Sequence, residues 1–188
     1  MTKQSDVDYG PLKSLIGAWA GDKGLDVAPD PDGTEHNPYY ETITFSAVGE
    51  VSNAESQLLA TIHYRQIVKR KSDDNVFHDE TGYWMWDAEA RIVMHSLTIP
   101  RAVCVLAGGT YDGETDSDGS ILLTVSAGLD DEHWQIVQSP FMRKQARTTE
   151  FRHRITVGTN ALSYSETTTV DIYGKIFEHT DCNELIRQ

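Results

Sequence analysis

Near the start, the chain reads Leu15-Ile16-Gly17-Ala18-Trp19-Ala20-Gly21, a segment that joins a short helical stretch to a first strand. Glycine lets backbone segments approach closely, and an indole ring fills the space beneath them. A glycine-flanked tryptophan at the entry to a sheet is therefore typical of a β-barrel that is closed at one end. Such a barrel has an interior, and the functional question is what this interior holds.

The rest of the chain indicates about ten strands separated by turn residues. After the strand at Trp19, we expect strands at 40–48, 58–68, 77–86, 91–99, 102–107, 121–127, 147–157, 162–170 and 175–186. Residues 8–16, with Pro11 near the first turn, predict a short helix. Residues 26–38 contain three prolines and predict a long loop.

Consecutive hairpins favour an all-β fold, a closed antiparallel up-and-down barrel, over a sandwich, because a sandwich leaves sheet edges to protect. The whole chain, 1–188, is expected to form a single domain, with the barrel spanning about 15–187. The regular spacing of the strands is also found in barrels of the lipocalin and fatty-acid-binding-protein type.

Composition excludes several classes of partner. The formal charge of −13, from 16 basic and 29 acidic residues, disfavours nucleic acid and anionic membranes. No apolar run approaches the roughly 20 residues of a membrane helix, and the first six residues lack the apolar core of a signal peptide. Two cysteines are too few for a disulfide framework, so we expect a cytoplasmic protein. Cys104, between apolar neighbours, is expected to be an unreactive core thiol.

Alternation along the strands predicts which histidines face the interior. His153 shares the parity of the apolar residues in strand 147–157 and is expected inside. In the last strand, His179 shares a face with Tyr173 and Phe177. His78 and Glu80 lie on one face of their strand and could share a site, but such pairs are more often surface features.

Three segments carry a resemblance to a known family. They are the run from Pro11 to Gly21, the run Phe77-His78-Asp79-Glu80-Thr81-Gly82-Tyr83-Trp84, and Leu162-Ser163-Tyr164 leading to a last strand with His179. Together they resemble the nitrobindin family, whose ten-stranded antiparallel barrels look like fatty-acid-binding proteins. The better-known members hold ferric haem through one histidine near the C-terminus.

The resemblance assigns roles residue by residue. Gly17, Trp19 and Gly21 match the family's Gly-x-Trp-x-Gly opening, whose third glycine arrives one residue late as Gly24, and Trp19 is counted with the cofactor-binding residues. His179 takes the position of the proximal haem ligand, and hence of the metal ligand. His78 matches a histidine on the opposite side of the haem, and Thr168 stands where an apolar residue such as methionine is expected.

Two functions follow as expectations. The first is a haem b protein in which His179 binds the iron, with the other face open to nitric oxide and related ligands or to the isomerisation of peroxynitrite. The iron would then be the reactive centre, and no side chain is assigned a catalytic role. The second is a haem-free carrier or sensor of a fatty-acid-like apolar molecule, oriented by His78, His153 and the region of Arg101.

Neither function determines the assembly. The aromatic run Tyr83-Trp84-Met85-Trp86 can line the pocket or pack against a second copy in a homodimer. If side chains fill the interior, the remaining expectation is that the outer face of the barrel binds a protein partner.

Overall fold

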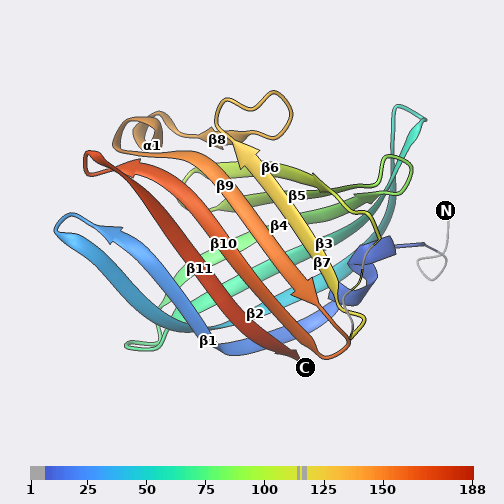
Figure 1. Cartoon of the computed structure of the whole chain (residues 1–188), viewed down its shortest axis with the longest axis horizontal. Helices are drawn as coiled ribbons and strands as arrows, with labels where there is room; N and C mark the ends of the chain where they lie inside the picture. The colour runs from blue at the N-terminus through green and yellow to red at the C-terminus, as the bar shows by residue number, and fades with distance from the viewer. Residues whose placement is uncertain (1–6, 114, 116–117) are drawn as a thin grey trace.

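The computed structural model describes residues 7–113, 115 and 118–188, and its strands form one curved antiparallel sheet that closes on itself (Figure 1). The strands are β1 (Gly17–Asp30), β2 (Gly33–Asn53), β3 (Gln57–Arg70), β4 (Val76–Asp87), β5 (Ile92–Ile99), β6 (Val103–Thr110), β7 (Ile121–Gly128), β8 (Ile136–Gln138), β9 (Ala146–Val157), β10 (Ala161–Ile172) and β11 (Lys175–Arg187). Two short helices accompany them, the 3-10 helix η2 (Gly10–Leu15) and the α-helix α1 (Pro140–Gln145).

Ten strands form the closed ring. The order is β5-β4-β3-β2-β1-β11-β10-β9-β7-β6, and β6 pairs back with β5. Neighbours in sequence are mostly neighbours in the sheet, as expected for an up-and-down barrel. Between β6 and β7, the described residues form a single ladder pair, Gly108 with Ser126. The short β8 pairs with β6 beyond this point, through Val103 to Val105. The predicted closed all-β barrel is confirmed, with one additional strand.

The segment around Trp19 closes the end of the barrel beside η2. The Trp19 side chain is fully buried, and its Nε1 donates a hydrogen bond to the Leu15 carbonyl oxygen at 2.7 Å. The Arg187 guanidinium covers the indole ring at 4.1 Å and donates hydrogen bonds to the carbonyl oxygens of Ile16 and Ser14. The predicted helix over 8–16 is present only as the six-residue η2, whose Leu12 and Leu15 are fully buried.

The predicted loop over 26–38 is wrong, because these residues extend β1 and β2 into a hairpin. Pro29 lies beyond the last β1–β11 pair, which joins Val27 to Thr180, and Pro38 precedes the first β2–β3 pair. Both prolines therefore lie where their strand has only one neighbour, a position that tolerates the missing N–H. Pro31 lies in the turn itself. The tip of this hairpin lies at the end of the barrel opposite η2, together with α1 and the β10–β11 turn (Figure 1).

The interior placement of Cys104 is also wrong. Val103 and Val105 face the core, so Cys104 between them faces outward and is exposed, as is Cys182. The run 102–107 is almost entirely apolar, and such a run carries no alternation from which parity can be inferred. No helix in the described ranges is long and apolar enough to cross a membrane.

Candidate functional site

The half of the barrel away from η2 contains a cavity of about 370 Å³. The cavity has an apolar wall from β5, β6 and the start of β9, which includes Leu97, Val105 and Phe151. A second wall, formed by β1, β4, β10 and β11, presents carboxylates and imidazoles. Its ionisable residues are Asp26, His78, Glu80, Glu166, His179 and Asp181. A cavity of this size is within the range that small ligands occupy.

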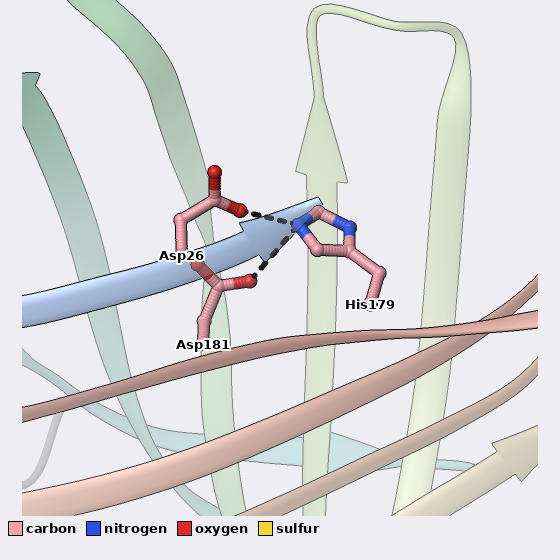
Figure 2. A group of neighbouring side chains, drawn as sticks. All are labelled: Asp26, His179 and Asp181. Carbon is pink, nitrogen blue, oxygen red and sulfur yellow. Dashed lines mark hydrogen bonds and ion pairs between the residues drawn. The ribbon is translucent and has the colours of Figure 1, made fainter. Parts of the chain in front are cut away.

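His179 lies in this cavity between two aspartates, Asp26 and Asp181 (Figure 2). The β1–β11 ladder brings them together, because it pairs Asp26 with Asp181, two residues after His179 on the same face. The Nε2 of His179 lies 2.5 Å from the Asp26 Oδ1 and 3.5 Å from the Asp181 Oδ2. Asn37 donates a second hydrogen bond to Asp26, at its Oδ2, over 2.8 Å. These three residues each offer one ligand atom within 4.8 Å of the others, so they also form a candidate metal-ligating group.

The charges in this cluster reinforce one another. Burial works against charge on His179, but the hydrogen bond to Asp26 and the charge of Asp181 raise its pKa. Burial opposes charge on Asp26 too, yet the hydrogen bonds from His179 and Asn37 lower its pKa. Burial raises the pKa of Asp181 to about 7, although the charge of His179 acts in the opposite direction. The hydrogen bond thus favours the charged forms of His179 and Asp26, whereas burial favours the protonated form of Asp181.

His78 and Glu80 begin a second polar chain, which runs from the cavity into the core. The His78 Nε2 lies 3.3 Å from the Glu80 Oε2, and the Tyr64 hydroxyl donates to the Glu80 Oε1. The same hydroxyl lies 2.8 Å from the His95 Nε2. Despite the effect of burial, Glu80 raises the pKa of His78 to about 9, whereas burial lowers the pKa of His95 to about 3.

The expectation that the His78–Glu80 pair is a surface feature is wrong, since Glu80 is only 4% exposed. The carboxylate is buried because it accepts from Tyr64 and faces the imidazole of His78, which together replace the solvent it has lost.

The remaining candidate residues divide between cavity and core. His153 is buried, as predicted, and its Nδ1 lies 2.8 Å from the Oε2 of Glu166, which lines the cavity. Thr168 lines the cavity next to Glu166 on β10. Trp19 is in the packed core at the closed end and is not among the residues that line the cavity. The structure therefore brings His78, Thr168 and His179 to one cavity and places Trp19 apart from them.

The floor of the cavity is another polar network that sequence reasoning missed. Glu41 is 2% exposed and accepts hydrogen bonds from Asn183 at 2.8 Å and from Gln66. Gln66 also donates to the Tyr164 hydroxyl, which is hydrogen-bonded to the Tyr39 hydroxyl at 2.7 Å. Burial raises the pKa of Glu41 to about 7, although its hydrogen bonds act in the opposite direction.

The parity that placed His179 inside could have identified part of the polar lining. Continued along β11, this parity places Asp181, Asn183 and Leu185 on the same inward face. Asp26 carried no such signal, because the segment around it was predicted to be a loop.

Comparisons with known proteins agree with this architecture. The crystal structure of Rv2717c from M. tuberculosis superimposes with a TM-score of 0.72, covering 97% of this chain and 99% of that chain at 22% sequence identity. At this identity, the likeness concerns the fold alone. No curated protein matches the sequence. The family model of the THAP4-like, heme-binding beta-barrel domain matches residues 8–187. The resemblance to the nitrobindin family is thus confirmed, and the chain belongs to the THAP4-like haem-binding β-barrel domain family.

Proposed function

We propose that this barrel is a haem-free carrier or sensor of a small molecule that has an apolar body and a polar head. The supporting observation is the division of the cavity, with Leu97, Val105 and Phe151 on one wall and a carboxylate–imidazole cluster on the other. Ligand sites commonly combine an apolar lining with a few convergent polar groups. The ligand's apolar part would contact the first wall, and its head would reach the cluster around His179 and Asp181.

The residues around His179 do not fit haem ligation in this arrangement. An imidazole binds a metal through a nitrogen that carries no proton. The Nε2 of His179 instead lies 2.5 Å from the Asp26 Oδ1, and this hydrogen bond raises the pKa of the histidine, which favours the protonated ring. Asp181 lies on the same side of the ring, at 3.5 Å from Nε2. Two carboxyl groups thus lie beside Nε2, and haem ligation through this nitrogen does not fit the arrangement.

Two measurements test the proposal. Native mass spectrometry of the purified protein should detect a bound organic molecule that is not haem. Titration with hemin should produce no sharp Soret band that depends on His179. The variant His179→Ala and the control His36→Ala, which removes an exposed histidine, separate specific ligation from surface binding. A sharp Soret band that His179→Ala loses and His36→Ala keeps would overturn the proposal.

Haem binding through His179 is the second candidate, and the family match favours it. It requires the Asp26–His179 pair to open, so Asp26→Asn should then strengthen hemin binding rather than weaken it. The nitric oxide binding and peroxynitrite isomerisation expected from the nitrobindin resemblance depend on this candidate. They would be measured only for a form that shows the His179-dependent Soret band.

A further inference from the structure

Charged side chains line the cavity at its rim and at its inner end. Arg70 is the last residue of β3 and Arg101 lies in the turn between β5 and β6, so both guanidinium groups belong to the open rim. Glu80 and Glu166 lie further along β4 and β10, toward the polar floor at Tyr164. A molecule that enters from the rim passes Arg70, Arg101 and the carboxylate of Glu35, and further in it meets carboxylates together with the imidazoles of His78 and His179.

The inner carboxylates differ in how well they are already paired. Asp26 has His179 and Asn37, Glu80 has His78 and Tyr64, and Glu166 has His153. For Asp181, the His179 Nε2 at 3.5 Å is the only ion-pair partner in the described part of the chain, and no described residue donates a hydrogen bond to it. Asp181 thus retains acceptor capacity inside the cavity, where its side chain is half-buried.

Because the imidazoles of His179 and His78 are already paired with Asp26 and Glu80, we infer from the remaining acceptor capacity of Asp181 that the ligand carries a cationic head of the ammonium type. This head binds to Asp181 with Glu166 close by, while the apolar body contacts Leu97, Val105 and Phe151. This inference rests on the proposed function and specifies its ligand class. An ammonium group donates three hydrogen bonds and accepts none, which suits a site made of carboxylate oxygens. A charged donor paired with a carboxylate away from water is also among the stronger polar contacts.

A fatty-acid head fits the same cavity less well. A carboxylate at the inner end would face Asp181 and Glu166, and like charges in a desolvated site repel. It would have to remain at the rim with Arg70, whose guanidinium already covers the Phe77 ring at 4.9 Å and lies 3.4 Å from Asp73. The apolar part of the molecule would then point toward the polar floor instead of away from it.

The experiment compares n-decylamine with n-decanoate, because the two share an apolar chain and differ in the sign of the head group. Binding of each to the full chain is measured by isothermal titration calorimetry at pH 7.5. We expect decylamine to bind at least tenfold more tightly than decanoate. Asp181→Asn should weaken decylamine binding at least tenfold. The control Glu178→Gln removes an exposed carboxylate from the opposite face of β11 and should leave this binding unchanged.

Each alternative outcome has a distinct meaning. Equal or tighter binding of decanoate, reduced by Arg101→Gln, overturns the cationic head and leaves the carrier proposal in place. Failure of both probes to bind, together with no co-purified molecule in native mass spectrometry, overturns the carrier proposal itself. Binding of Zn²⁺ that requires Asp26 and Asp181, without any binding of decylamine, overturns the inference in favour of a metal site. Circular dichroism of each variant verifies that loss of binding is not loss of folding.

Discussion

Asp181 should destabilise the barrel at alkaline pH, and Asp181→Asn should remove this effect. Burial raises the pKa of this carboxyl to about 7 in the folded protein, against an ordinary value of 3.8. Between these two pH values, the folded protein retains a proton that the unfolded chain has released. The free energy of unfolding therefore falls as the pH rises through this window, and the loss is complete above pH 7.

The size of the effect follows from the two pKa values. Roughly three pH units at about 1.4 kcal/mol each correspond to an upper limit of about 4 kcal/mol. The asparagine variant also loses the attraction to His179 at 3.5 Å, which opposes part of the gain. We therefore expect Asp181→Asn to be more stable than the parent by about 2 kcal/mol at pH 8, which raises the melting temperature by about 4–8 °C in a protein of this size.

Thermal unfolding followed by circular dichroism at pH 4, 5, 6, 7 and 8 measures this difference directly. The gain should be mostly lost at pH 4, where the aspartate is protonated in the folded protein and about 40% protonated in the unfolded chain. Glu178→Gln, on the outer face of the same strand, should show no comparable pH-dependent gain. A variant that is less stable than the parent at pH 8, or a difference that stays constant with pH, would refute the assignment of Asp181 as a half-buried carboxyl group with a raised pKa.

Three further results are expected. Gly24→Ala places a Cβ 2.0 Å from a ring carbon of Tyr39 and should lower the unfolding free energy in urea by about 1–3 kcal/mol. Gly33→Ala meets open space and should change it by less than about 0.5 kcal/mol; equal effects would contradict the packing of Tyr39 on Gly24. Cys104 and Cys182 should both react with a thiol reagent in the native protein, because both are exposed. If Cys104 reacts only after unfolding, it lies in the core and the exposed position is wrong. In an NMR titration of the imidazole resonances, His95 should remain neutral down to about pH 3 and His78 should stay protonated up to about pH 9. A lower pKa for His78 than for His95 would contradict the polar chain that connects the two through Glu80 and Tyr64.

The sequence predicts the barrel well because its signals are local. The glycines around Trp19, the alternation that places His153 inside, and the frequent turn residues all act within one strand or hairpin. For residues 26–38 the same local signals gave a wrong prediction, because prolines usually interrupt strands. Their tolerance depends on which side of each strand lacks a neighbour, and this is a property of the assembled sheet.

The candidate site was predicted only in part for a related reason. His179 and His78 were identified, but the partner that sets the charge of His179 is Asp26, 153 positions away in sequence. Closure of the barrel makes β1 and β11 neighbours, and no short-range pattern reports on that pairing. Buried carboxylates are moreover rare enough that a strand residue such as Glu80 is assigned to the surface by default.

The placement of the acidic residues along the barrel argues that they serve binding and not stability. At the closed end, Trp19, Leu12 and Leu15 form a dense apolar core, so this chain can fill its interior with hydrocarbon. In the cavity and at its floor, it places Asp181 and Glu41 instead, both with a pKa raised to about 7 by burial. Carboxyl groups whose pKa is raised by burial lower the free energy of unfolding at neutral pH, and apolar side chains in their place would avoid this loss of stability. A cation bound beside them would reverse the effect of burial, because its charge stabilises the ionised carboxyl. Relief of this unfavourable burial would then contribute to the free energy of binding. This accounts for the position of these carboxyl groups in and beside the cavity and not at the closed end.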